Sequence, residues 1–219
     1  MNGILSGKRI KEFLSTHPNA RMIFYKQTVV IQIVLSSLVL GAMYFNQDSI
    51  GIIGLSFVRE IVPVIGMLAV CFLGWGLLWI YRFNAENLKK GMIRDAAVMF
   101  LFPTSLKEYR WSIGVSFAAG ICEEIVYRGF LYWQLTYYMP IIPALFLTNL
   151  VFGLSHYATG PKNSSLAFAL GVAFSLIFLY TKSLIVLMII HVLVDVFSMT
   201  RGLRYSELAS SENATLEEE

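Results

Sequence analysis

The sequence predicts an all-α membrane protein, a polytopic helix bundle of about six transmembrane helices with one interfacial helix. Of its 219 residues, 57% are hydrophobic and only 14% are charged, whereas a soluble domain carries about 25% charged residues. The mean hydropathy is +0.65. Apolar runs long enough to cross a bilayer also recur along the chain. A chain of this length fits one compact bundle.

Two of the predicted spans lie in the first half of the chain. The first runs from Met22 to Phe45, which is the length of a full crossing and too long for the core of a signal peptide. The second runs from Ile61 to Tyr81. The apolar piece from Ala96 to Phe102 is too short to span a membrane, so we predict an amphipathic interfacial helix there.

Four further spans are predicted in the second half. They are Trp111 to Met139, Ile142 to His156, Ser164 to Thr181 and Ser183 to Met199. The third span of the chain is too long for a perpendicular crossing and is expected to tilt. We therefore divide the chain into an N-terminal part with two spans (1–110), a four-helix core (111–200) and a polar cytoplasmic tail (201–219). The acidic stretch of this tail, from Glu207 to Glu219, is expected to be solvated and frayed.

The distribution of basic residues predicts the orientation. Lys and Arg concentrate in residues 1–26 and 82–110 and again at Arg201 and Arg204. Six spans would put all these segments and both termini on one side, which the positive-inside rule identifies as the cytoplasm. The default membrane is a bacterial plasma membrane. Nothing indicates a nucleic-acid surface, and the oligomeric state is not predicted.

The two cysteines do not indicate a disulfide. Cys71 and Cys122 both lie inside apolar runs, where a small buried hydrophobic residue is the simpler interpretation. Cys122 precedes a pair of glutamates, but no neighbouring histidine indicates a thiol nucleophile.

That pair, Glu123 and Glu124, lies with Arg128 near the middle of the third predicted span. Ionisable groups at such a depth cost roughly 3 kcal/mol each to insert, so they usually have a function. Glu124 and Arg128 are four residues apart, which favours an ion pair on one helix face. Glu123 has no such partner and is therefore the candidate general base. The alternative is a buried ion pair that only ties helices together.

Two further clusters lie in the fourth and sixth spans. His156 follows Phe152 by four residues, and Asp195 follows His191 by four. Asp195 could hold the tautomer of His191, or both could face a substrate or a metal. Either histidine could instead be a packing residue with an internal hydrogen bond. The direction of the spans places all these residues near the midplane or in its cytoplasmic half, so we expect one shared polar cavity.

Three motifs together resemble one known family. They are Glu-Glu-x-x-x-Arg at 123–128, Phe-x-x-x-His at 152–156 and His-x-x-x-Asp at 191–195. In this order on separate spans, they closely resemble the CPBP (CAAX protease and bacteriocin-processing, or Abi) family, which includes type II CAAX prenyl proteases. The resemblance covers roughly residues 108–200.

The resemblance implies an intramembrane endopeptidase of the glutamate type. By motif, Glu123 would activate the hydrolytic water. Glu124 and Arg128 would form the pair that orients Glu123. His156 would position the water or polarise the carbonyl, while His191 and Asp195 would stabilise the oxyanion. The substrate would be a membrane-tethered peptide or protein near the cytoplasmic face, with a lipid-modified C-terminal tail or a bacteriocin or pheromone precursor as options.

The third motif differs from the usual family pattern, and this difference leaves a metal-dependent mechanism as an alternative. The third motif often ends in Asn, whose amide donates a hydrogen bond, whereas an ionised Asp195 cannot. Asp195 would have to be protonated, act through His191, or bind a cation. His156, His191 and a carboxylate would make a plausible zinc set, although no His-Glu-x-x-His pair is present. We predict no cofactor, with a zinc-dependent or other divalent-metal protease as the alternative.

Two non-protease functions are also compatible with the sequence. One is a membrane scaffold or bacteriocin-immunity protein, although the full set of polar residues argues against it. The other is a transporter with a buried carboxylate relay, although the paired half-helix breaks often seen in transporters are missing.

Overall fold

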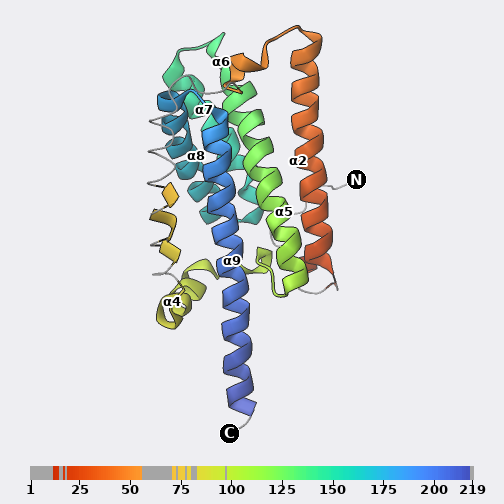
Figure 1. The fold of residues 1–219 in the computed structure, drawn as a ribbon, viewed down its shortest axis with the longest axis vertical. Helices are drawn as coiled ribbons and strands as arrows, with labels where there is room; N and C mark the ends of the chain where they lie inside the picture. Colours follow the sequence, from red (N-terminus) through yellow and green to blue (C-terminus); the bar gives the residue numbers. More distant parts are fainter. Residues whose placement is uncertain are drawn as a thin grey trace.

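A computed structural model describes residues 12–14, 17, 19–55, 71, 72, 74–76, 78, 79, 83–96 and 98–217. Every regular element in these ranges is a helix (Figure 1). The longer ones are α2 (Ala20–Phe45), α4 (Ala85–Asp95), α5 (Leu106–Glu123), the π-helix η3 (Glu124–Leu131), α6 (Tyr132–Thr136), α7 (Ile141–Ser155), α8 (Pro161–Thr181) and α9 (Leu184–Glu217). Short 3-10 turns are η1 (Ile50–Ile53), η2 (Met99–Leu101) and η4 (Tyr157–Thr159). The predicted all-α bundle is confirmed.

Three helices in the described part of the chain are long and apolar enough to cross a membrane: α2, α8, and α9 over Leu184–Glu212. The helix α7 is apolar but shorter. The predicted third span corresponds to α5, η3 and α6, which follow one another without a break from residue 106 to residue 136. Most of the predicted second span lies outside the described residues, so the count of six spans stays a prediction.

Local sequence signals explain where several helices begin and end. The Ser105 side chain accepts a hydrogen bond from the backbone N–H of Glu108 at the start of α5, as expected of an N-cap serine. Asn84 does the same for α4. Pro161 opens α8, where its missing N–H costs nothing. Lys182 then ends α8 with a positive φ of 54°, which makes the tight connection to α9.

Two predictions about the polar segments need correction. The amphipathic helix is α4, not residues 96–102, because α4 buries Leu88 and carries charged residues on its other face, whereas 96–102 is apolar and precedes Pro103. This apolar piece forms only the single turn η2. The acidic stretch from Glu207 is not frayed over the described residues, because α9 continues to Glu217. Its later turns carry an ion pair between Glu212 and Lys89 of 2.5 Å.

The bundle is built around α5. Along its length α5 packs against α9 on one side and α2 on the other, while α7 and α8 pack against each other (Figure 1). Buried apolar residues such as Met43, Ile53, Phe178 and Leu187 form the main core. Large apolar side chains such as Ile31 face outward, which is the surface that a lipid environment favours.

Polar contacts fix the position of α2 against the start of α5. The Arg21 guanidinium forms a 3.0 Å ion pair with Glu108 and donates to the Thr104 hydroxyl at 2.7 Å. One turn later the Tyr25 hydroxyl donates to the carbonyl of Leu101 at 2.6 Å. These contacts hold the same end of both helices together, so α2 has a defined register along α5.

Candidate active site

The helix changes its hydrogen-bonding pattern at the glutamate pair. Glu123 is the last residue of α5, and the π-helix η3 begins at Glu124. A π-helix bonds each N–H to the carbonyl five residues earlier and is frequently found at functional sites. The change of pitch therefore falls at the position where the sequence places its candidate catalytic residues.

Glu124 is enclosed by two cationic or donor groups. Its side chain is 0% exposed. Its Oε1 accepts a hydrogen bond from Nη1 of Arg128 at 3.0 Å and one from Nδ1 of His191 at 2.8 Å. The predicted ion pair within the helix is present, and it extends to a histidine of α9. Glu124 thus couples the π-helix to α9.

Arg128 is held from several sides. Its Nη2 donates to Oδ1 of Asn149 at 3.3 Å, and its guanidinium lies 4.2 Å from the ring centroid of Phe152. Asn149 in turn donates to the Ser175 hydroxyl at 3.0 Å. A cation over an aromatic ring is stabilised when it is removed from water. Together these contacts tie η3 to α7 and α8.

A glycine in α8 makes room for this cluster. A Cβ atom at Gly171 would lie 2.7 Å from Oδ1 of Asn149 and 2.8 Å from Nη2 of Arg128. Both distances are shorter than a normal contact, so a larger residue would displace the guanidinium or the amide. The absence of a side chain at Gly171 therefore permits the contact between Arg128 and Asn149.

Glu123 has a different environment. Its Oε1 accepts a hydrogen bond of 2.5 Å from the side-chain amide of Gln32 in α2. Its Oε2 lies 3.9 Å from Nε2 of His191, which is too far for a hydrogen bond. Within the described residues no Arg or Lys is ion-paired with Glu123, so its carboxylate remains available to a reacting group.

His191 lies between the carboxylates. Because a carboxylate only accepts, Nδ1 of His191 carries the hydrogen that is donated to Glu124. Its Nε2 is directed to the other side, 3.8 Å from Oδ2 of Asp195. The spacing of four residues does place His191 and Asp195 on one face, as predicted. However, it is Glu124, and not Asp195, that holds the tautomer of His191.

His156 lies at the end of α7. Its Nδ1 is 2.9 Å from the carbonyl oxygen of Phe152, so this nitrogen donates and Nε2 is left for another partner. His156 is close enough to Asp195 for their charges to interact. Tyr127 of η3 bonds to Ser155, the neighbour of His156. All six predicted site residues therefore meet directly or through their charges in one region of the bundle.

Exposure separates the four charged residues other than the histidines into two groups. The side chains of Glu124 and Arg128 are both 0% exposed. The side chain of Glu123 is 11% exposed, and that of Asp195 is 29% exposed. The cluster therefore has a closed side at the ion pair and an open side at Asp195. Glu123 is itself buried but lies toward this open side, from which a substrate could reach it.

The described residues do not form a metal-binding cluster, and the metal-dependent protease stays an alternative. Among the residues that the structure describes, no three or more His, Cys, Asp or Glu side chains are grouped so that they could hold a metal ion. Nδ1 of His191 and Nδ1 of His156 are both engaged within the protein, which leaves Nε2 of each as the only ring nitrogen that could bind a metal. We therefore derive no step through a metal.

Sequence reasoning missed several residues of this site. Gln32 bonds to Glu123, Asn149 and Ser175 complete the shell around Arg128, and Tyr127 reaches the end of α7. The signal was present, because each is a polar residue within an apolar stretch. The sequence does not say, however, which helices bring them together.

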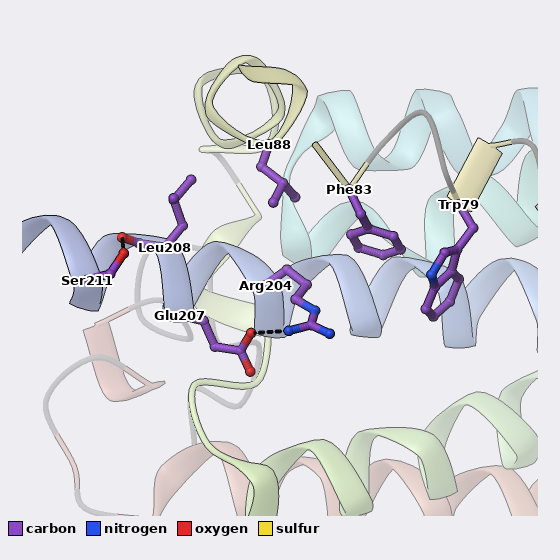
Figure 2. Close-up of a pocket in the computed structure, with 7 residues that line it drawn as sticks. All are labelled: Trp79, Phe83, Leu88, Arg204, Glu207, Leu208 and Ser211. Atoms are coloured by element: carbon purple, nitrogen blue, oxygen red, sulfur yellow. Dashed lines mark hydrogen bonds and ion pairs between the residues drawn. The ribbon is translucent and has the colours of Figure 1, made fainter. Parts of the chain in front are cut away.

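A separate hollow lies beside the later part of α9. Figure 2 shows Trp79, Phe83 and Leu88 lining it on one side, with Arg204 donating to Glu207 at 2.7 Å on the other. None of the six predicted site residues lines this hollow. The candidate active site is therefore the polar cluster inside the bundle.

Comparison with known families agrees with the motifs. Residues 105–197 match the family model for type II CAAX prenyl endopeptidase, Rce1-like. The matched segment covers less than half of the chain and is similar to that family. The match includes all six site residues but not α2 or α4. The comparisons with curated proteins and with solved structures gave no match. The matched segment is thus similar to a family of proteases, and the long apolar helices are those expected of a membrane protein.

Proposed function

We propose that the protein is an intramembrane endopeptidase of the glutamate type, in which Glu123 activates the hydrolytic water. The observation that carries this proposal is the contrast in surroundings between Glu123 and Glu124. One carboxylate is closed off by Arg128 and His191, while the other lies on the open side with one oxygen 3.9 Å from the imidazole of His191.

The chemistry is a direct hydrolysis. Glu123 takes a proton from water, and the oxygen of that water attacks the carbonyl carbon of the scissile peptide bond. The carbon–nitrogen bond of the tetrahedral intermediate then breaks, and the proton held by Glu123 passes to the leaving amine. One water is consumed, and one new carboxylate and one new amine are formed. Glu123 returns to its initial state.

His191 is suited to stabilise the negative oxygen of the intermediate. Its Nδ1 hydrogen is committed to Glu124, so donation from Nε2 requires the imidazolium form. Glu123, Glu124 and Asp195 surround the ring, and we assign them the counter-charge of that form. A preorganised donor of this kind is worth about 3 kcal/mol in the transition state. In this proposal Asp195 does not contact the oxyanion itself but acts by supporting the imidazolium form of His191.

The proposed substrate is a peptide or protein tethered to the membrane. The name of the matched family points to a prenylated CAAX tail as the first substrate to test. A bacteriocin or pheromone precursor would share its essential features, namely a flexible segment near the bilayer. The lipid bilayer would then hold the substrate and the open side of the site at a similar depth.

The proposed orientation puts both termini in the cytoplasm of a bacterial cell. The start of α2, the start of α5, α4 and the end of α9 lie at one end of the bundle (Figure 1). This end carries many basic residues, including Arg21, Lys89, Lys107 and Arg204, whereas the turn between α8 and α9 has only Lys182. Positive charge marks the cytoplasmic side. Cleavage would then occur on substrates that reach the site from that side.

The test is a cleavage assay with the purified protein in liposomes. The substrate is a fluorogenic CAAX peptide with and without a prenyl group, and the Glu123→Gln variant is compared with the wild type. Loss of the general base is expected to lower kcat by roughly 10²- to 10⁴-fold. Glu86→Gln is the matched control, because Glu86 is an exposed carboxylate of α4 and its loss leaves the site intact.

Three outcomes would change the proposal. Normal cleavage by Glu123→Gln would contradict the general-base role. Loss of activity on treatment with a chelator, with recovery on addition of Zn²⁺, would favour the metal-dependent alternative. Absence of cleavage by the wild type for prenylated, unprenylated and bacteriocin-like peptides would favour a scaffold.

A further inference from the structure

The first helix of the described bundle contributes a polar contact to the proposed catalytic base. Gln32 lies in the middle of α2, which is outside the segment that matches the family. Its amide Nε2 donates to Oε1 of Glu123 at 2.5 Å. The two residues are 91 positions apart in the chain, so the contact depends on how α2 packs against α5.

The position of Gln32 on its helix makes this contact informative. Val30, Ile31, Ile33 and Val34 are 50–64% exposed and form an apolar outer surface, whereas Gln32 is only partly exposed. A primary amide within an apolar span costs free energy unless it is hydrogen-bonded. A leucine would avoid that cost entirely. The hydrogen bond to Glu123 offsets the cost of burying the amide. We therefore look for the role of Gln32 in its effect on Glu123.

The contact acts on one oxygen of the carboxylate. The amide can donate only through its N–H groups, and it uses them on Oε1. Oε2 is the oxygen that lies 3.9 Å from Nε2 of His191. A carboxylate that is hydrogen-bonded at one oxygen can no longer rotate freely, so its two oxygens do not exchange places. The result is that Oε2 is presented toward the imidazole.

The support for Gln32 is itself rigid. The ion pair of Arg21 with Glu108 and the hydrogen bond of Tyr25 to Leu101 hold α2 against α5 at one end. At the other end Met43 is fully buried in the main core with Ile53 and Leu184. Gln32 lies between these two fixed points, so its amide is held at a defined height beside Glu123.

We propose that Gln32 is a positioning residue for the catalytic base: it holds Oε1 of Glu123 so that Oε2 is the atom that takes the proton from water. This inference rests on the proposed role of Glu123 as general base. It assigns the first helix a part in the reaction that the matched segment does not contain. The effect falls on the chemical step, because a misplaced catalytic atom lowers the rate even when the substrate still binds.

The test is the kinetic effect of Gln32→Met, which preserves the length of the side chain and removes the donor. The steady-state parameters are measured with the peptide that the wild type cleaves. We expect kcat to fall roughly 10- to 100-fold while KM and the thermal unfolding temperature stay near the wild-type values. Gln27→Met is the matched control, since Gln27 is an exposed amide on the same helix. It is expected to leave kcat unchanged.

A second variant separates positioning from packing. Gln32→Glu has the shape of the wild-type residue but places a second carboxylate next to Glu123 in place of the donor, so it should also lose kcat. Unchanged kcat in both variants would overturn the inference. So would a fall in the unfolding temperature with a normal kcat for the folded fraction, because that is the behaviour of a residue that only joins two helices. A wild type without cleavage activity would instead refute the proposed function.

Discussion

Glu123 and Glu124 are neighbours in the chain, yet their carboxylates belong to different parts of the molecule. Glu124 points into the closed side of the cluster, where Arg128 and His191 bond to one of its oxygens. Glu123 is turned toward α2 and the open side, where its partner is the neutral amide of Gln32. Successive residues of a helix project about 100° apart, which is sufficient to give the two carboxylates separate surroundings.

The difference between the two sides explains how one site can be both stable and reactive. Groups that only orient others can be fully enclosed and multiply bonded, as Arg128 is by Glu124, Asn149 and Phe152. A group that exchanges protons with water needs an accessible oxygen without a permanent cationic partner. The closed side therefore carries stability, and the open side carries the proposed chemistry.

The largest expected effect on stability is that of Glu124→Gln. This change leaves the Arg128 guanidinium buried without a counter-charge, which costs about 3–5 kcal/mol. It also replaces the charged acceptor that orients His191 with a weaker, neutral amide oxygen, so the activity of any folded protein should fall. The measurement is the folded yield and the thermal unfolding temperature in detergent. A variant that is fully stable and active would show that the ion pair does not organise the site.

The second prediction concerns the space around Arg128. Gly171→Ala would place a Cβ atom against the guanidinium and the Asn149 amide, and such overpacking costs about 1–3 kcal/mol. Gly41→Ala is the matched control, because a Cβ atom there would meet nothing within 4 Å. Thermal unfolding of both variants is compared with the wild type. Equal stability of the two variants would indicate that Arg128 can move away without cost.

The smallest predicted effect on stability concerns an ion pair outside the bundle interior. It tests whether the charge of a less buried carboxylate also stabilises the fold, as that of Glu124 does. Asp95 of α4 pairs with Arg201 of α9 at 2.9 Å and accepts a hydrogen bond from Tyr205. Burial alone would raise the pKa of Asp95, but the hydrogen bond from Arg94 and the charge of Arg201 outweigh it and lower the pKa from 3.8. A lowered pKa means that the ionised form contributes stability above that ordinary value.

This contribution should disappear as the pH falls through the pKa of the folded state. Asp95→Asn is therefore expected to lower the free energy of unfolding at pH 7 by about 1.5 kcal/mol, so it should unfold at a lower temperature than the wild type. The difference should shrink below about pH 4. The check is thermal unfolding of both proteins from pH 7 to pH 3. A difference that does not change with pH would mean that the charge of Asp95 is not what attaches α4 to α9.

Features that depend on neighbouring residues could be predicted from the sequence. The apolar spans, the ion pair of Glu124 with Arg128 and the shared face of His191 and Asp195 all follow from hydropathy or from a spacing of four residues. The π-helix did not follow, because its hydrogen bonds depend on the surrounding packing. The interfacial helix was misplaced, because its apolar face is narrow whereas the adjacent loop is apolar throughout.

Contacts between distant helices could not be predicted. The sequence offered Asp195 as the partner of His191, since no rule of spacing connects His191 to Glu124, 67 residues earlier. The same limit applies to Gln32 and Asn149, whose polar character was visible but whose partners were not. Which residues meet between two helices depends on how far the helices are shifted along each other and on the angle at which they cross. Neither can be inferred from the spacing of residues within one helix.

The most direct test of the account compares Glu123→Gln with Glu124→Gln in one experiment that records both cleavage and thermal unfolding. We predict that both variants lose cleavage but that only Glu124→Gln loses stability, because only Glu124 compensates a buried cation. Equal destabilisation of the two variants, or cleavage by Glu123→Gln, would contradict the division of the site into a closed supporting side and an open reactive side.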